Sequence, residues 1–509
     1  MRKSKHAIRS SKAAPLFELL AVVSALGLLS ALAVWFFFSR GWTLWYGDAE
    51  AHLNTARRII DSRTPGYAQL GTPWLPLLHV LLIPFVRVDR WWQSGIAAAF
   101  PSAAFFVMGG AFLFAAARRV FDSTAAGVTA AALAAFNPNL LYLQSTSMTE
   151  AIFFGCMMAL LYFTVRDWAA AAGIAACAAA LTRYEGWWLL PFVAGYFAVR
   201  RQWRRAVIFS AIAALGPLYW MGHNWFFTGD PLDFYRGPYS PLAIQGNADY
   251  PGRGDWRAAW LYYLTAARLV AGPGLAIIGC IGAIFALLRR AFWPLILLAL
   301  PPLFVLWSMH RGVVPIFVPE LWPHAYYNSR YGLHALPLLA FAAAALVTIA
   351  PVRFRAAAAT AVIAVGIAWW IGYPRPQGWI TWAESRANSE GRRAWMYETA
   401  EFLKPRYTPG AGILSAAGDD FYGVFRVAGI PLHQTFGIPN GISFLAAAAR
   451  PDLFLHEEWA VVKGGDLAQS AVLRAGRYGI HYFLLDTIIE KNEPVIEIYR
   501  RIGGNHGPS

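Results

Sequence analysis

Several ionisable side chains fall beside long apolar stretches, where a chemical site could form. Asp48 and His52 stand four residues apart in the string GDAEAH, so on a helix they share one face and Glu50 falls on another. A carboxylate such as that of Asp48 can accept a proton from an attacking hydroxyl or amine, which makes it a candidate general base. The structural alternative is that Asp48 caps the N-terminus of this helix, and the two roles do not exclude each other.

A second acidic candidate, Glu150, stands in STSMTEA at the junction of two apolar segments. Its position equally suits a carboxylate that stabilises a helix N-terminus. Two carboxylates brought to one membrane face, in surroundings rich in Arg and Trp, indicate chemistry more specifically than either carboxylate alone.

The string LTRYEGWW places Arg183, Tyr184 and Glu185 between two short apolar segments. Ionisable residues at membrane depth are costly, so they usually line a cavity or pair with each other. Arg183 therefore has two interpretations. It forms an ion pair with Glu185 or Glu150, or it binds a phosphate group.

The string HAYYNSRYGLHALPLL begins at His324 and puts Arg330 and Tyr331 at the start of another apolar segment. A guanidinium at this place can hold a phosphate through paired N–H donors. The alternative is that Arg330 and Tyr331 anchor the chain at the lipid head groups. The spacing of the nearby histidines matches no familiar zinc pattern, and there is no Gly-rich phosphate loop or HExxH helix.

The elements that must position these residues are membrane helices. The 509-residue chain is 58% hydrophobic and 14% charged, whereas soluble domains have roughly 45–50% apolar and about 25% charged residues. Residues 16–38 alone exceed the roughly 20 apolar residues that span a bilayer. The net charge is +15. Because the Arg residues cluster at the ends of apolar runs, this charge indicates membrane topology and not a nucleic-acid partner.

The basic connectors determine the predicted topology. Further apolar segments cover residues 74–86, 94–117, 124–144, 150–165, 169–182, 186–199, 206–222, 259–288, 291–309, 331–350 and 356–373. Segment 74–86 is short and contains two prolines, so we expect it to be re-entrant or shallow, which places every short Arg-rich connector in the cytoplasm. We therefore predict about eleven crossings, with a kink at Gly272-Pro273-Gly274. The basic residues 1–12 indicate an uncleaved signal anchor with a cytoplasmic N-terminus.

The tail changes composition after about residue 376. Residues 379–403 have helical spacing, and the strand-like strings GILSAA, AVV and HYFLLD follow, with a helical DLAQSAVLRAG between them. This alternation predicts a small α/β domain. The predicted fold is thus a polytopic α-helical membrane domain, 1–375, with an amphipathic outer loop at 40–73, followed by an extracytoplasmic α/β domain, 376–509.

In their order and spacing, these strings resemble the GT-C glycosyltransferases, and within them bacterial relatives of protein O-mannosyltransferases and of the aminoarabinose transferase that acts on lipid A. The likeness covers roughly residues 16–350. It rests on GDAEAH, GTPWLPLLHVLL, FPSAAFFVMGGAFLFAAARRVFD, NPNLLYLQSTSMTEA, LTRYEGWWLLP and SRYGLHALPLLAFAAA. Two features depart from the family: Ala49 separates the acidic residues of the first motif, and Arg183-Tyr184-Glu185-Gly186 stands where relatives often have Lys-Gly-Pro.

The resemblance implies an inverting glycosyltransferase at the outer face of the cytoplasmic membrane. Its donor would be a polyprenyl-phosphate-linked hexose or pentose, and its acceptor a glycan, a lipid or a protein. The implied catalytic residues are Asp48 and Glu150. The implied residues for the donor phosphate are Arg183, Arg330 and Tyr331. We add as candidate substrate-binding residues Glu50, His52, Tyr184, Glu185 and His324.

The reaction requires no cofactor, although two outward carboxylates could bind a divalent metal ion. A membrane transporter or lipid flippase is the main alternative from another class. Against it, the sequence has no inverted repeat and no pair of interrupted helices in matching halves. A ligase that joins preassembled lipid-linked glycans is a further alternative.

Overall fold

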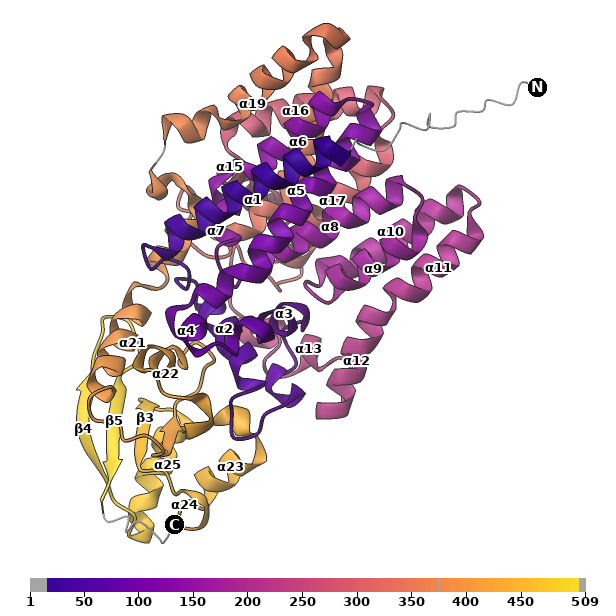
Figure 1. Ribbon diagram of the computed structural model, residues 1–509. Coiled ribbons are helices and arrows are strands. Elements are labelled where there is room, and N and C mark those ends of the chain that lie inside the picture. The colour runs from indigo at the N-terminus through magenta and orange to yellow at the C-terminus, as the bar shows by residue number, and fades with distance from the viewer. Residues whose placement is uncertain (1–15, 374, 503–509) are drawn as a thin grey trace. The chain divides into compact units, whose positions relative to one another are not determined.

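The computed structural model describes residues 16–373 and 375–502, and most of these residues are helical (Figure 1). The basic residues 1–12, predicted to precede a signal anchor, lie outside the described part. By its internal contacts the chain divides into two units. The first comprises residues 16–39, 102–145 and 149–384, and the second 40–101, 146–148 and 385–502. A domain boundary at residue 375 stays a prediction.

The regular elements of the first unit are helices, as expected where long apolar runs must satisfy their backbone polar groups internally. These helices are α1 (Leu16–Phe38), α5 (Ala99–Phe121), α6 (Thr124–Ala135), α7 (Pro138–Leu143), α8 (Glu150–Val165), α9 (Ala169–Ala180), α10 (Glu185–Val199), α11 (Trp203–Ala213), α12 (Leu215–Thr228), α13 (Asp233–Arg236), α14 (Pro241–Gln245), α15 (Trp256–Ala271), α16 (Pro273–Leu288), α17 (Phe292–His310), η3 (Ser329–His334), α18 (Ala335–Ala344), η4 (Ala345–Ile349), η5 (Val352–Phe354), α19 (Arg355–Gly372), η6 (Pro376–Gly378) and α20 (Ile380–Ala387). An isolated antiparallel bridge pairs Phe317 with Tyr327 in the loop between α17 and η3.

Within the described residues, six helical stretches are long and apolar enough to cross a membrane, or seven if one bent pair counts as a span. The predicted number of about eleven crossings is not confirmed, because several predicted segments form shorter helices. For example, α6 and α9 have 12 residues each and α8 has 16. At 1.5 Å per residue such helices are about 18–24 Å long, against a hydrocarbon core of about 30 Å.

The bent pair is α15 and α16, which meet at an angle of 108°. The bend falls at Gly272, between Ala271 and Pro273, so the kink expected at the Gly-Pro-Gly run is confirmed. Proline fits the first turn of α16 because its missing N–H has no partner there in any helix. Helix α15, which precedes the bend, packs against η3 and α17.

A close contact between α16 and α18 fixes the helix that follows η3. A Cβ atom added at Gly282 would lie 2.3 Å from the carbonyl oxygen of Ala342 and 2.7 Å from the Cα atom of Ala343. Small residues allow helix backbones in membranes to approach each other this closely. The glycine therefore sets the distance between these two helices.

Gly282→Ala is expected to destabilise the first unit by about 1–3 kcal/mol, because the added methyl group overlaps a helix backbone that cannot easily move. The thermal unfolding midpoint in detergent would fall. Gly195→Ala on α10 is a matched control, because a Cβ at Gly195 meets no atom within 4 Å. Equal midpoints for the two variants would contradict the close packing of α16 on α18.

The second unit combines the first loop with the tail. Its helices are α2 (Gly47–Arg58), η1 (Tyr67–Leu70), α3 (Leu77–Val86), α4 (Asp89–Ser94), η2 (Ile96–Ala98), α21 (Glu390–Leu403), α22 (Gly423–Ala428), η7 (Leu432–Gln434), η8 (Ile438–Asn440), α23 (Ile442–Ala449), α24 (Pro451–Phe454), α25 (Leu467–Ala475) and η9 (Gly476–Tyr478). Its strands are β1 (Ile413–Ser415), β2 (Thr435–Phe436), β3 (Trp459–Lys463), β4 (Tyr482–Ile488) and β5 (Ile496–Arg501).

The five strands form one mixed sheet in the order β2-β1-β3-β5-β4. β1 runs parallel to β2 and β3, whereas β5 runs antiparallel to β3 and β4. The strands expected in GILSAA, AVV and HYFLLD are confirmed as β1, β3 and β4, and the expected helix between them is α25. A hydrophobic core joins this sheet to α23 and α25, with Leu414, Phe444 and Val472 among its buried residues.

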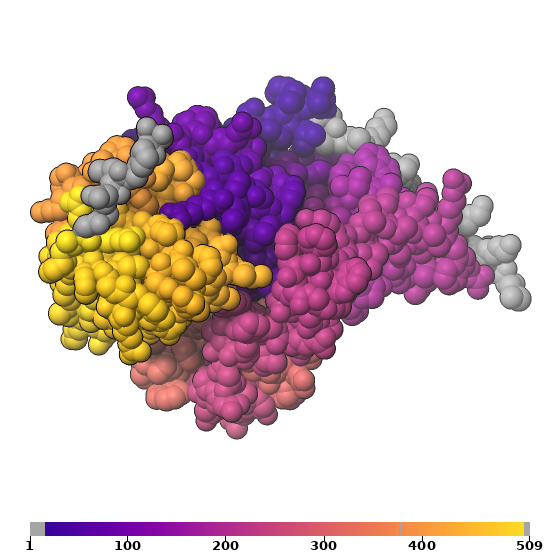
Figure 2. Space-filling model, turned by 90° about the horizontal axis from the view of Figure 1, so that it is seen from below, coloured from indigo at the N-terminus to yellow at the C-terminus, as the bar shows by residue number. Residues whose placement is uncertain are grey.

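The stretch 40–101 lies beside the tail, as the purple and yellow parts of Figure 2 show. Helix α4 contacts α22. The helix α2 is buried from Ala49 to Arg58, and its arginines pair within the unit: Arg57 with Asp61, and Arg58 with Asp419, each at 2.8 Å. An amphipathic outer loop at 40–73 stays a prediction. Segment 74–86 contains α3, which has 10 residues and packs on α2. A re-entrant path for this segment stays a prediction.

Candidate functional site

Three helical segments of the first unit begin near one point, and each brings an ionisable side chain there. Glu150 is the first residue of α8, Glu185 is the first residue of α10, and Arg330 is the second residue of η3. Carboxylates in a first helical turn are stabilised by the helix dipole. Glu150 and Glu185 thus each stand at a helix position where a negative charge is favourable.

Arg183 lies in the turn between α9 and α10 and makes both of the ion pairs considered from the sequence. Its Nη2 atom is 2.8 Å from Oε1 of Glu185, and its Nη1 atom is 3.1 Å from Oε1 of Glu150. Nη1 also donates to the hydroxyl of Thr149 at 2.8 Å. The guanidinium is buried and is held in a fixed orientation by three groups.

Arg330 contacts the same carboxylate from another side. Its Nε atom is 3.3 Å from Oε1 of Glu150, and its Nη1 atom donates to Oε1 of Glu384 at 3.2 Å. One carboxylate oxygen of Glu150 therefore lies between two guanidinium groups. The ring of Tyr331 borders both, with the Cζ atoms of Arg183 and Arg330 at 4.8 Å and 5.8 Å from its centre. Cation–π attraction adds to the ion pairs at these distances.

His334 is a further member of the cluster. Its Nε2 atom is 3.3 Å from Oε1 of Glu185, and its Nδ1 atom is 2.8 Å from the carbonyl oxygen of Tyr331. The backbone that carries these residues approaches α15 closely, since a Cβ at Gly332 would lie 2.5 Å from the carbonyl oxygen of Ala266. In η3, a 3₁₀-helix, residues three apart share a face, which places His334 on the same face as Tyr331.

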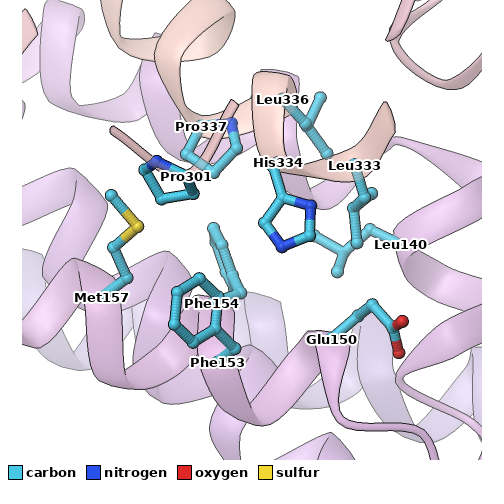
Figure 3. Close-up of a pocket in the computed structure, with 10 residues that line it drawn as sticks. All are labelled: Leu140, Glu150, Phe153, Phe154, Met157, Pro301, Leu333, His334, Leu336 and Pro337. Carbon is cyan, nitrogen blue, oxygen red and sulfur yellow. The ribbon is translucent and has the colours of Figure 1, made fainter. Parts of the chain in front are cut away.

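A small cavity adjoins the cluster (Figure 3). Its volume is about 20 Å³, and Glu150 and His334 line it together with apolar residues that include Phe153, Phe154 and Pro301. A water molecule needs roughly 10–15 Å³, so the cavity can hold one. Within the part of the chain that the structure describes, Oε2 of Glu150 is buried and has no hydrogen-bond partner. This oxygen is thus an acceptor for a group that enters beside it.

Glu384 completes the cluster from α20, although it was not predicted from the sequence. Its Oε2 atom accepts a hydrogen bond from the backbone N–H of Ser329 at 2.7 Å and another from the Ser329 hydroxyl. Burial raises the pKa of Glu384, even though Arg330 and Ser329 act in the opposite direction. The full set can bind an oxyanion through its guanidinium groups and accept a proton or a hydrogen bond through its carboxylates.

The acidic motif of the first loop belongs to the second unit. Asp48 is half-buried in the first turn of α2. Glu50 is 0% exposed, and both of its oxygens accept hydrogen bonds from Arg426, at 2.7 Å each. Asn54 donates to Oε1 of Glu50 at 2.9 Å. These contacts attach α2 to α22, whereas the substrate contact predicted for Glu50 stays a prediction.

The other candidate substrate residues have different surroundings. His52 is buried, with its Nδ1 atom 2.9 Å from Nε2 of His79. The Tyr184 hydroxyl accepts a hydrogen bond from the indole of Trp220 at 3.1 Å. His324 is exposed and lies 3.0 Å from the carbonyl oxygen of Pro319. Their substrate roles stay predictions. Within residues 16–373 and 375–502, no group of three or more His, Cys, Asp or Glu side chains is placed to hold a metal ion.

Comparisons of sequence find no relative, because no protein-family model and no curated protein matches the chain. The crystal structure of ArnT from Cupriavidus metallidurans bound to undecaprenyl phosphate matches with a TM-score of 0.56 and 13% identity, over 95% of this chain and 98% of that one. ArnT in the apo state matches with a TM-score of 0.55 and 14% identity, over 93% and 97% of the two chains.

The archaeal oligosaccharyltransferase AglB from Archaeoglobus fulgidus is also similar, with 14% identity over 87% of this chain and 69% of that one. Its TM-score is 0.45, which is too low to support a conclusion. ArnT is the lipid A aminoarabinose transferase and belongs to the GT-C superfamily. At this sequence identity the likeness shows the fold alone. The GT-C resemblance predicted from the motifs is thus confirmed at the level of architecture, and the chain has the GT-C fold.

Proposed function

We propose that this chain is a membrane glycosyltransferase that moves a sugar from a polyprenyl-phosphate donor to an acceptor at the outer face of the cytoplasmic membrane. The observation that carries the proposal is the convergence of Arg183 and Arg330 on Glu150 and Tyr331, at the start of three helical segments. The fold gives further support, because the chain has the fold of ArnT over nearly its whole length. One ArnT structure is bound to undecaprenyl phosphate.

The proposed division of labour follows from charge and burial. The two guanidinium groups bind the donor phosphate and stabilise the negative charge that grows on it as the sugar leaves. Tyr331 and Glu150 hold both guanidinium groups at one place. Because the surroundings are largely dry, these electrostatic contacts are stronger than they would be in water.

Asp48 is the proposed base that accepts the proton of the attacking hydroxyl or amine. Of the two acidic residues in GDAEAH, Glu50 is fully buried against Arg426, whereas Asp48 is half-buried. A direct displacement at the anomeric carbon inverts the configuration of the sugar. The scheme uses no cofactor and requires no metal ion.

Arg330→Ala is expected to weaken the binding of undecaprenyl phosphate by about tenfold to a hundredfold, because hydrogen bonds to a charged group contribute about 1.5–3 kcal/mol. The measurement is the Kd of the purified protein in nanodiscs. Arg330→Lys keeps the charge but loses the planar fork, so its affinity should fall between those of the wild type and Arg330→Ala. Arg204→Ala, on an exposed residue of α11, is the control. An unchanged Kd for Arg330→Ala would remove Arg330 from the phosphate site.

The enzymatic proposal is tested in proteoliposomes that contain undecaprenyl phosphate carrying a radiolabelled hexose or pentose, with cell-envelope extract as the source of acceptors. Covalent transfer of the label to an acceptor supports the proposal, and the mass of the product identifies both the sugar and the acceptor. Movement of the label across the bilayer without a covalent product would replace the proposal with a transporter. An added mass of many sugars would replace it with a ligase.

A further inference from the structure

The carboxylate of Glu384 is bound as an anionic ligand would be. Its Oε2 atom accepts hydrogen bonds from the backbone N–H of Ser329, at 2.7 Å, and from the Ser329 hydroxyl. Its Oε1 atom accepts from Nη1 of Arg330 at 3.2 Å. Glu384 is 1% exposed. Buried donors that include an N–H, a hydroxyl and a guanidinium thus surround one negatively charged group.

The backbone around Ser329 contributes to this arrangement. Asn328 has a φ of 53°, in the left-handed region, and the following residue begins η3. A left-handed residue followed by right-handed ones turns successive N–H groups toward one side, and such concave arrangements bind anions. The N–H of Ser329 therefore faces an anion for reasons built into the local backbone, and Glu384 is the anion that meets it in this structure.

The same donors suit a phosphate group. Phosphate and carboxylate oxygens both accept from backbone N–H groups, hydroxyl groups and guanidinium groups, and arginine binds both in the same forked manner. A sugar phosphodiester carries one negative charge, as a carboxylate does, so one can replace the other without changing the charge of the cluster. The donors also adjoin Arg183 through the shared contact with Glu150.

We propose that the N–H and hydroxyl of Ser329 form the phosphate site together with Arg330, and that Glu384 fills this site until the phosphate of the lipid donor displaces it. The inference rests on the proposed function and extends it, since it adds Ser329 as a ligand and Glu384 as a competitor. Burial already raises the pKa of Glu384, which means that its carboxylate is poorly compensated where it lies. A move of this carboxylate into water would remove that desolvation.

The displaced carboxylate would move with the helix that carries it. Glu384 lies on α20, an eight-residue helix, at the position where the chain leaves the first unit. Helix α20 ends at Ala387, and α21 begins at Glu390 after a short break. Displacement requires α20 to shift while η3 stays in place, against the hydrogen bonds from the N–H and hydroxyl of Thr381 to Asn139, at 3.0 Å and 2.9 Å. After transfer, the return of Glu384 would compete with the product phosphate and favour its release.

The test is the Kd of undecaprenyl phosphate for the purified full chain in nanodiscs. Glu384→Gln should bind about tenfold more tightly than the wild type, because removing the competitor raises the fraction of sites that are open. Glu390→Gln, on an exposed glutamate of α21, is the matched control and should bind as the wild type does. In the Glu384→Gln background, a further Ser329→Ala change should weaken binding severalfold. A folded Glu384→Gln protein with equal or weaker affinity overturns the inference.

Two further arms keep the outcomes distinct. Hydrogen exchange of the wild type should rise across residues 380–387 when undecaprenyl phosphate saturates the protein, and unchanged protection there contradicts displacement even if Glu384→Gln does not fold. Inorganic phosphate is titrated in parallel: a gain for both ligands means that the phosphate group suffices, and a gain for the lipid alone means that the prenyl chain contributes. If the wild type does not bind undecaprenyl phosphate, the proposed function itself is overturned. If the wild type binds it and Glu384→Gln binds it no more tightly, only this inference is overturned.

Discussion

Asp48→Asn is expected to lower the rate of sugar transfer by about 10²–10⁴-fold, which is the usual contribution of a general base. Asparagine keeps the size of the side chain and can still hydrogen-bond in the first turn of α2, but it cannot accept a proton. Initial rates in proteoliposomes measure the effect. The affinity for undecaprenyl phosphate should stay the same, because the residues proposed to hold the phosphate are unchanged.

The control is the same Asp-to-Asn change at an exposed residue that is not proposed to take part in the reaction. Asp249→Asn serves, since Asp249 is exposed in the loop between α14 and α15. If Asp48→Asn retains a rate close to that of the control, Asp48 is not the base. Glu150→Gln would then be the next variant, because within the described residues Oε2 of Glu150 is a buried carboxylate oxygen with no hydrogen-bond partner.

Arg426→Ala is expected to destabilise the second unit by about 3–5 kcal/mol, the usual cost of leaving a buried charge without its partner. Glu50 is fully buried, and Arg426 donates to both of its oxygens. Burial alone would lower the pKa of Arg426, but the Glu50 carboxylate outweighs it and raises that pKa. The measurement is the unfolding midpoint in denaturant, followed by limited proteolysis between residues 385 and 502.

Two comparisons separate this effect from ordinary surface electrostatics. Arg500→Ala removes an exposed ion pair with Glu458 and should cost less than about 1 kcal/mol. Replacing the buried pair with apolar residues, as Glu50→Leu with Arg426→Met, should recover most of the loss, because neither charge is then left alone. A wild-type midpoint for Arg426→Ala would show that Glu50 is compensated by another group.

The parts of the site that could be predicted are those that local sequence determines. The pairing of Arg183 with Glu185 follows from two positions in one turn, and Glu150 was recognisable at the start of a helix. In contrast, Arg330 and Glu384 are 54 positions apart, and Glu50 and Arg426 are 376 positions apart. No spacing rule relates such pairs, because only the folded chain brings them together.

Fold prediction had the same limit. Apolar runs located the helices, but the sequence does not distinguish a spanning helix from a shorter buried one such as the Ala-rich α9. The bend between α15 and α16 was the exception, because the Gly-Pro-Gly run marks its position in the sequence. The strands that escaped prediction have weak signals: β2 has two residues, and β5, with the sequence IEIYRR, is half charged.

The discontinuous second unit has a consequence for biosynthesis. Residues 40–101 leave the ribosome well before residues 385–502, because 102–384 are translated in between. At about 5–20 residues per second, the delay is on the order of tens of seconds. During that time Glu50 and Arg58 have been synthesised but their partners, Arg426 and Asp419, have not. The loop can therefore reach its final structure only after translation of the tail, and a nascent chain that stops before residue 385 exposes it to proteases and chaperones.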